Sequence, residues 1–188
     1  MEKILQENET SQIPSHDEEA EKILAAQKDP QAFGILYDHY APPIYRYLLS
    51  RLGNIDAAQD VTSQTFLTAI DQLPQYKHRG KFTAWLFSIA RSRYVDYIRN
   101  TKRTSDPINE EYPDPYPGQL NDLVNEERRR ALFECIQNLM PQEQELLRLR
   151  YVADLSFAEM GSLVKKREDA VKKSFYRLLK KIKRMLEA

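Results

Sequence analysis

The segment at residues 104–122, TSDPINEEYPDPYPGQLND, constrains the fold of this chain more than any other stretch. Its four prolines lack the backbone N–H that a helix needs, so a continuous helix cannot pass through it. Residues 104–125 also contain five Asp or Glu and no Lys or Arg, a composition typical of a linker. We therefore expect a disordered N-terminus at residues 1–16, a domain at 17–103, an acidic linker at 104–122 and a second domain at 123–188.

Helix-forming residues dominate on both sides of this linker. Leu, Ala, Glu, Lys, Arg and Gln are frequent, strand-like alternation is scarce and only five glycines occur in 188 residues. This pattern predicts an all-α fold with two small helical domains. A helix from Phe33 to Gly53 should break or kink at Pro42 and Pro43, because proline removes backbone donors. Further helices are expected at residues 55–73, 81–100, 123–140, 141–152, 155–164 and 168–186.

The residues that usually carry catalysis or bind metals are scattered. His16, His39 and His78 have no acidic or cysteine partner at ligand spacing, and no glycine-rich phosphate loop is present. We therefore expect no enzyme activity, no metal and no cofactor. The single cysteine, Cys135, excludes an internal disulfide and is interpreted as a small core residue. The chain has no apolar run of membrane-spanning length and no signal-peptide pattern, so we expect a cytoplasmic protein without membrane insertion.

The charges of the chain cancel overall but are unevenly distributed. Residues 75–103 and 165–188 each carry a net charge of +7, whereas residues 104–164 carry −7 and residues 1–29 carry −5. Two basic blocks on an otherwise acid-biased chain favour two contact surfaces for a polyanion such as a nucleic acid. Solvated faces of lysine-rich helices are the alternative that charge alone leaves open.

The first basic block contains the helix expected at residues 81–100. At about 100° per residue, one broad apolar arc contains Phe82, Trp85, Leu86, Ile89, Ala90 and Tyr97. The other side contains positions 84, 88, 91, 92, 95 and 99, and therefore a polar stripe made of Ser88, Arg91, Ser92 and Arg99. Trp85 could stack on a base, but its place on the apolar arc favours core packing.

The second basic block has the spacing of a helix-turn-helix. Apolar residues of the first helix (Met160, Leu163, Val164) could pack on those of the second (Val171, Phe175, Leu178), and Gly161 would allow close approach. The opposite face of the second helix would then present Lys172, Lys173, Tyr176, Arg177 and Lys180 to duplex DNA. An ordinary amphipathic helix with lysines extended into solvent is the alternative.

Five motifs together resemble the extracytoplasmic-function sigma factors, which are two-domain specificity subunits of bacterial RNA polymerase. They are FGILYDHYAPPIYRYL, DVTSQTFLTAI, FTAWLFSIARSRYVDYIR, LMPQEQELLRLRYVADLSFAEMGSLV and AVKKSFYRLLKKI, within residues 29–186. The resemblance implies a transcription initiation factor that binds core RNA polymerase, recognises the minus-thirty-five and minus-ten promoter elements and promotes promoter melting. Core RNA polymerase and promoter DNA are the implied partners, and an anti-sigma factor is a further one.

The resemblance also implies roles for particular residues. The minus-ten strand would be held by the polar stripe and the loop before it, through Tyr76, His78, Arg79, Lys81, Arg91, Ser92 and Arg99. The minus-thirty-five duplex would be contacted by the five residues of the second basic helix. The polymerase would be bound by Asp60, Gln64, Leu67 and Asp71, for which plain solvent exposure is the alternative.

The chain departs from the family pattern at three places. Ser63-Gln64 stands where Gln-Glu is frequent, Ser92 where Asn is frequent, and Lys165 where the helix-turn-helix often has Gly. A left-handed conformation at Lys165 would cost roughly 1 kcal/mol relative to glycine. Two other functions fit the residues: a helix-turn-helix regulator that acts without being a polymerase subunit, and a helical adaptor protein.

Overall fold

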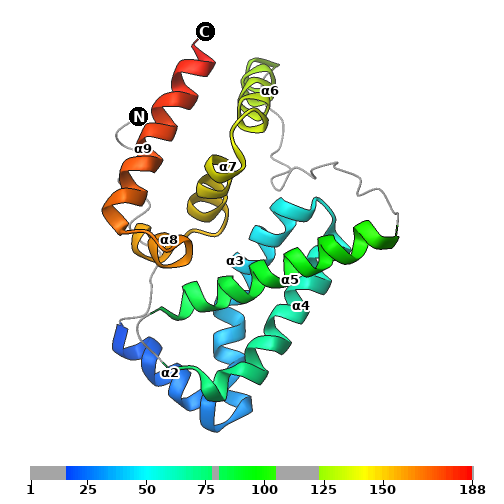
Figure 1. The fold of residues 1–188 in the computed structure, drawn as a ribbon, viewed down its shortest axis with the longest axis vertical. Helices are drawn as coiled ribbons and strands as arrows, with labels where there is room; N and C mark the ends of the chain where they lie inside the picture. The colour runs from blue at the N-terminus through cyan, green and yellow to red at the C-terminus, as the bar shows by residue number, and fades with distance from the viewer. Residues whose placement is uncertain (1–15, 78–80, 105–122, 188) are drawn as a thin grey trace.

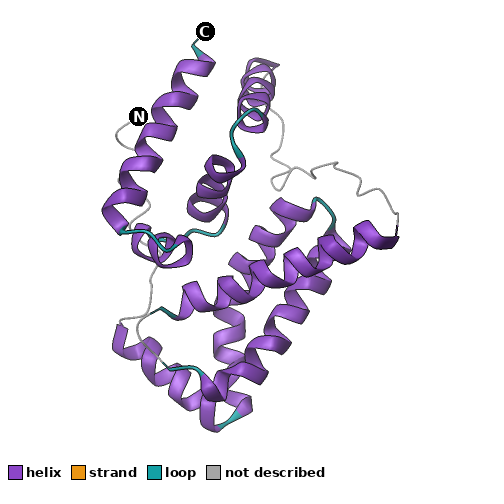
Figure 2. Ribbon diagram, viewed as in Figure 1, coloured by secondary structure: helices purple, strands orange, loops and turns teal. Residues whose placement is uncertain are grey.

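The structure, a computed structural model, describes residues 16–77, 81–104 and 123–187. All regular elements in those ranges are helices, joined by short turns, and none of the described residues forms a strand (Figure 2). The all-α prediction is confirmed. The predicted disordered N-terminus and acidic linker fall almost entirely on residues 1–15 and 105–122, which lie outside the described residues.

The N-terminal domain is a group of helices in which α3 and α5 cross (Figure 1). Its core contains Ile44, Leu48, Val61, Phe66 and Leu86, each at most 3% exposed. Burial of such side chains contributes about 1.5–3 kcal/mol each. The elements are α2 (His16–Lys28), η2 (Pro30–Ala32), α3 (Phe33–Leu52), α4 (Ile55–Gln72), η3 (Leu73–Gln75) and α5 (Phe82–Thr104).

The junction between α3 and α4 follows its sequence signals. Gly53 adopts a left-handed conformation with φ 65° and ends α3, as glycine commonly does after a helix. Asn54 then caps α4, because its side-chain oxygen accepts a hydrogen bond from the Ala57 amide at 2.8 Å. This turn folds α4 back against α3, so that one face of α4 packs on α3 and the other faces solvent.

The predicted break at Pro42 and Pro43 is wrong, because α3 runs through both residues as one helix. The two prolines remove amide donors that would reach the carbonyls of Asp38 and His39. Both of these residues are exposed, so water can hydrogen-bond to the freed carbonyls. The burial of Tyr40, Ile44 and the rest of the inner face outweighs the loss.

The C-terminal domain is a second group of helices that contains the helix-turn-helix. Cys135 and Leu139 pack against Leu178 and Ile182, so Cys135 is a core residue as predicted. Its elements are α6 (Leu123–Gln137), α7 (Pro141–Leu147), a π-helical turn η4 (Arg148–Val152), α8 (Phe157–Val164) and α9 (Glu168–Leu186).

The two domains pack directly on each other. Helix α8 lies against α5, and η4 lies against α3, so one apolar cluster continues from the N-terminal domain into Leu149, Leu155 and Met160. Contacts with α3, α4 and α8 bury the first half of α5 on several sides. Ala84, predicted on the polar side of this helix, is therefore buried, as are Thr83 and Phe87.

Candidate nucleic-acid interface

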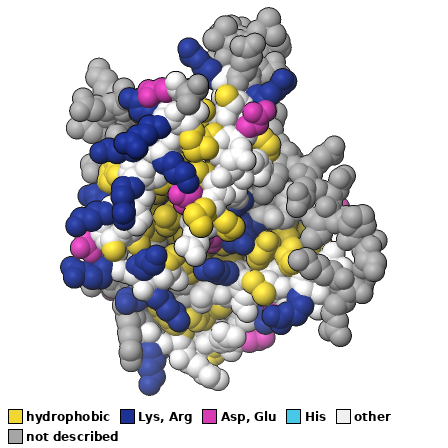
Figure 3. Space-filling model, turned by 45° about the horizontal axis from the view of Figure 1, so that its top comes forward, with side chains coloured by type: hydrophobic (Ala, Val, Ile, Leu, Met, Phe, Trp, Pro, Cys, Tyr) yellow, Lys and Arg dark blue, Asp and Glu magenta, His cyan; other side chains and the backbone are white. Residues whose placement is uncertain are grey.

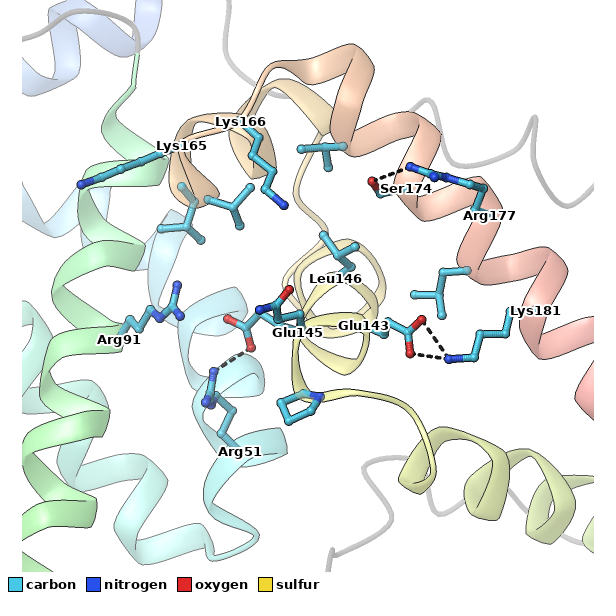
Figure 4. A pocket seen from close by; sticks show the side chains of 16 residues that line it. Arg51, Arg91, Glu143, Glu145, Leu146, Lys165, Lys166, Ser174, Arg177 and Lys181 are labelled. Carbon is cyan, nitrogen blue, oxygen red and sulfur yellow. Dashed lines mark hydrogen bonds and ion pairs between the residues drawn. The ribbon is translucent and has the colours of Figure 1, made fainter.

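The polar stripe on α5 faces solvent on one side of the helix. Ser88, Arg91, Ser92 and Arg99 are exposed, and so is Lys81 just before the helix. The side chain of Arg91 also borders a cavity between the domains (Figure 4). His78 and Arg79, which were predicted to contact DNA, lie outside the described residues. The described part of the stripe can therefore offer two guanidinium groups to phosphates along one helix face.

An aromatic cluster anchors the loop that precedes α5. The ring of Tyr76 lies 4.6 Å from that of Trp85 and 5.5 Å from that of Phe82, measured between centroids. Trp85 is half-buried and packs on Phe82 as well, which agrees with core packing. The carbonyl of Tyr76 accepts a hydrogen bond from Gln27 Nε2 at 2.7 Å. Tyr76 therefore belongs to the same packed cluster, and its ring contacts Trp85 and Phe82.

Helix α9 separates its apolar and basic residues along its whole length. Val171, Phe175, Leu178 and Ile182 are buried. The predicted packing on α8 is confirmed for Val171 and Phe175, which share one cluster with Met160, whereas Leu178 belongs to the cluster of Cys135 and Leu139. Lys and Arg side chains gather over α9 in the space-filling view (Figure 3). The five residues predicted to contact duplex DNA are all exposed: Lys172, Lys173, Tyr176, Arg177 and Lys180.

The turn before α9 keeps a left-handed residue although glycine is absent there. Lys165 ends α8 with φ 56° and ψ 42°, so the chain accepts the cost of this conformation in a non-glycine residue. Gly161 makes the turn possible. A Cβ atom on Gly161 would lie 2.8 Å from the Lys166 carbonyl oxygen and 3.3 Å from the Glu168 amide nitrogen. The close approach predicted for Gly161 is therefore real, and it fixes how α9 leaves α8.

Helix α4 presents the stripe that was predicted to bind polymerase. Asp60, Gln64, Leu67 and Asp71 are exposed on one face, and Leu67 is 63% exposed. Gln64 Nε2 donates a hydrogen bond to Asp60 Oδ2 at 2.8 Å, which orders the polar part of this face. The opposite face is buried through Ala58, Phe66 and Ala69. A single exposed leucine is normal on a protein surface, so the exposure of this face fits both a protein contact and plain hydration.

A charged cluster between the domains was not predicted from the sequence. Glu145 on α7 is only 8% exposed. Its Oε1 accepts a hydrogen bond from the Tyr47 hydroxyl at 2.8 Å, and its Oε2 accepts one from Arg51 Nη1 at 2.6 Å. The guanidinium of Arg51 also lies 4.2 Å from the ring centroid of Tyr94. Helical periodicity places Tyr47 and Arg51 one turn apart on α3, but it contains no signal for a partner 94 residues away.

The surroundings shift the pKa values of this cluster. Burial raises the pKa of Tyr47, and the adjacent Glu145 carboxylate raises it further. Burial alone would lower the pKa of Arg51, but its neighbours Tyr47 and Glu145 outweigh that effect and raise it. Tyr47 therefore stays a neutral donor and Arg51 stays charged, so both donors to Glu145 persist at neutral pH.

The cavity beside this cluster has a volume of about 790 Å³. Leu146 and Val164 contribute apolar surface, while Arg51 and Arg91 come from the N-terminal domain and Arg177 from α9 (Figure 4). None of the described residues forms a group of three or more His, Cys, Asp or Glu side chains suited to a metal ion. No helix among the described residues is long and apolar enough to cross a membrane.

Both domains match descriptions of known protein families. Sigma-70 region 2 matches residues 36–104, and sigma-70 region 4 matches residues 129–182. The chain is 34% identical over 174 residues to the ECF RNA polymerase sigma factor BldN of Streptomyces coelicolor, covering 88% of this chain and 64% of BldN. It is 26% identical over 152 residues to the ECF RNA polymerase sigma factor SigM of Bacillus subtilis, covering 79% of this chain and 91% of SigM.

The fold is also similar to that of a solved structure, CnrH in complex with the cytosolic domain of CnrY. The TM-score is 0.63 at 19% sequence identity, over 88% of this chain and 95% of that one. Sigma-70 region 2 followed by sigma-70 region 4 identifies a bacterial transcription initiation factor. The chain belongs to the extracytoplasmic-function group of the sigma-70 family.

Membership of this family decides between the functions that the sequence left open. A helix-turn-helix regulator independent of polymerase would not require a region 2 domain, and an adaptor would require neither region, so neither alternative is favoured. Sigma factors direct RNA polymerase to promoters and are generally not enzymes.

Proposed function

We propose that this chain binds core RNA polymerase through α4, contacts the minus-thirty-five element through α9 and holds the melted minus-ten strand along α5. The observation that carries the proposal is the presence of one exposed basic helix face in each domain. Duplex binding requires cations spaced along a helix that can enter a groove, which Lys172, Lys173 and Arg177 supply. Strand capture requires a cationic track beside the separated bases, which Arg91 and Arg99 supply.

The proposal includes no catalysis by the chain itself, because polymerase carries out the synthesis of RNA. The site of action would be the cytoplasm, where polymerase and promoter DNA are found. The proposal also keeps three predictions made from the sequence, namely a disordered N-terminus, an acidic linker and the limits of the two domains. An anti-sigma factor is a further proposed partner, because the resemblance suggests one. No contact among the described residues identifies where it would bind.

Run-off transcription with core RNA polymerase tests the proposed function. We expect the chain to direct initiation from specific promoters of its source genome, while the chain alone binds the same duplexes weakly. A regulator independent of polymerase would instead bind promoter duplex tightly by itself. Initiation from no promoter, under conditions where the core enzyme is active, would count against the sigma-factor assignment.

The polymerase surface has a separate test. The double substitution D60A/L67A should weaken binding to core enzyme about tenfold, because it removes an ordered carboxylate and an exposed apolar side chain at about 0.5–1 kcal/mol each. Gln59→Ala, at another exposed position of α4, is the matched control and should bind normally. Normal core affinity in D60A/L67A, with an unchanged circular dichroism spectrum, would remove this face from the interface.

A further inference from the structure

Helix α2 contacts the turn that precedes the basic segment at residues 77–81. We propose that Gln27 of α2 is a positioning residue for promoter opening, because it fixes the peptide that joins Tyr76 to Lys77. The inference rests on the proposed function and deepens it, since Tyr76 and Lys81 belong to the surface that would hold the melted minus-ten strand. Gln27 acts through the backbone and not by contacting DNA.

The side-chain amide of Gln27 joins α2 to this turn at two points. Its Nε2 donates hydrogen bonds to the Leu73 carbonyl at 2.9 Å and to the Tyr76 carbonyl at 2.7 Å. An amide nitrogen carries two hydrogens, and a carbonyl oxygen can only accept. Both donors of the half-buried Gln27 are therefore used on backbone that lies 46 and 49 residues further along the chain.

The turn held by Gln27 leads directly into the basic segment. The Tyr76 amide donates to the Leu73 carbonyl at 3.0 Å, which closes η3, and Leu73 is only 2% exposed. The Tyr76 carbonyl and the Lys77 amide belong to one planar peptide unit. The hydrogen bond that fixes the direction of this carbonyl therefore also fixes the direction in which the chain enters the segment at Lys77.

The other end of the segment is held by packing. The ring of Phe82 is buried and lies 5.2 Å from the ring of Tyr40 and 5.5 Å from that of Tyr76, measured between centroids. The Tyr40 hydroxyl donates to Glu19 of α2. Burial raises the pKa of Tyr40, and the Glu19 carboxylate raises it further, so Tyr40 stays a neutral donor. Helix α2 therefore supports both ends of the segment.

The two ends differ in what holds the backbone. At Phe82 the chain is already part of α5, so the helix fixes its peptides. At Tyr76 the chain is extended, with φ −69° and ψ 123°, and only the ring is packed against α5. A ring can stay packed while the peptide beside it rotates, because the two are joined by single bonds. The hydrogen bond from Gln27 is therefore what fixes this peptide.

A chain segment that is positioned beforehand binds a ligand more tightly than one that must be ordered during binding. Loss of the Gln27 donors should therefore weaken the holding of the melted strand about five- to tenfold. The proposed contacts of α4 with polymerase and of α9 with the upstream duplex do not involve this segment, so they should not change. A residue that only stabilised the domain would not alter which bases the melted strand site prefers.

The test compares Gln27 with Gln31, which is exposed on η2. Q27M keeps the length of the side chain but has no donor. In the holoenzyme we expect Q27M to reduce permanganate reactivity of promoter thymines about five- to tenfold, and to bind a pre-melted minus-ten bubble more weakly. Its preference among the four bases, measured by varying each position of that bubble, should also be smaller. Q31M should match wild type in all three measurements.

A second substitution separates hydrogen bonding from shape. Q27K places an ammonium group with three donors beside both carbonyls, so it should recover opening and base preference relative to Q27M. Q31K adds the same charge at the control position, and it measures how much of any gain comes from charge alone. Core affinity and upstream duplex binding should stay at the wild-type level in Q27M and Q27K.

Normal opening and an unchanged base preference in Q27M would overturn the inference. So would a defect that Q27K relieves no more than Q31K raises wild-type activity, because hydrogen bonding would then not be the cause. Circular dichroism at the assay temperature verifies folding, and an unfolded Q27M would make Gln27 a stabilising residue instead. If wild type opens no promoter, the proposed function fails and the inference with it, whereas a normal Q27M beside an active wild type removes the inference alone.

Discussion

The two basic helices, α5 and α9, differ in how much of their length is free. Helix α9 buries one apolar face and leaves the opposite, basic face exposed from Lys172 to Lys180. Helix α5 is buried on several sides over its first half, and Arg91 borders the cavity between the domains. The comparison teaches that the basic face of α9 is free along its length, whereas α5 is covered on several sides where its polar stripe begins. The proposed capture of a melted strand on α5 should therefore be more sensitive to the position of the second domain than the proposed duplex contact on α9.

The largest expected effect is the loss of the exposed face of α9. The triple substitution K172A/K173A/R177A should lower affinity for minus-thirty-five duplex roughly a hundredfold near 0.15 M salt, because each lost phosphate contact reduces the log–log salt slope by about 0.9. A salt titration of duplex binding by the holoenzyme measures both quantities. Lys28→Ala, an exposed lysine on α2, is the control and should bind normally. An unchanged salt slope in the triple variant would mean that α9 does not contact phosphates.

The next effect should distinguish α5 from α9. R91A/R99A should leave upstream duplex binding nearly unchanged and reduce promoter opening about tenfold, which corresponds to about 0.7 kcal/mol for each lost contact to a strand. Permanganate reactivity of promoter thymines measures opening, and a template with a pre-melted bubble should still bind weakly. Arg93→Ala is the control, because Arg93 lies on a half-buried face and pairs with Asp96 at 3.9 Å. If R91A/R99A opens the promoter as well as wild type does, the stripe is only a solvated helix face.

A third substitution tests how the turn positions α9. Gly161→Ala should lower the free energy of unfolding of the C-terminal domain by about 1–3 kcal/mol, because the added Cβ would overlap the Lys166 carbonyl. Gly34→Ala is a matched control on α3. Its added Cβ meets nothing within 4 Å, so it should stabilise the chain by about 0.5–1 kcal/mol through helix propensity. Chemical denaturation measures both values, and equal effects from the two alanines would contradict the close approach at Gly161.

The smallest effect concerns the pair that ties α9 to α7. The hydrogen bond from Lys181 lowers the pKa of Glu143 below its usual value of 4.5. Glu143 therefore stabilises the folded state above that pH, and its contribution is lost as pH falls through the lowered pKa. Because both side chains are partly exposed, we expect no more than about 1 kcal/mol. Denaturation between pH 3 and pH 7 should show a shallower acid loss for E143Q than for wild type, and parallel curves would contradict this.

Most structural features that depend on residues close together in the sequence could be predicted from it. The helices, the turn at Gly53 and Asn54, and the two faces of α9 follow from periodicity, capping and composition. The predicted break at Pro42 was wrong, because rules based on proline alone do not include the burial that stabilises α3. The burial of Phe87 and the partners of Glu145 were missed, because periodicity indicates which face is apolar but not that a second domain covers another face.

The π-helical turn at Arg148–Val152 lies between Glu145 and the helix-turn-helix, and the Ala153 amide bonds across five residues to the Arg148 carbonyl at 2.9 Å. Each residue in a helix rotates the chain that follows it by about 100° around the helix axis. A single-codon deletion in this turn would therefore rotate everything that follows relative to Glu145, while leaving every side chain of α9 intact. During evolution, one inserted or deleted residue here could change how the domains meet without altering the exposed face of α9 that we propose contacts DNA.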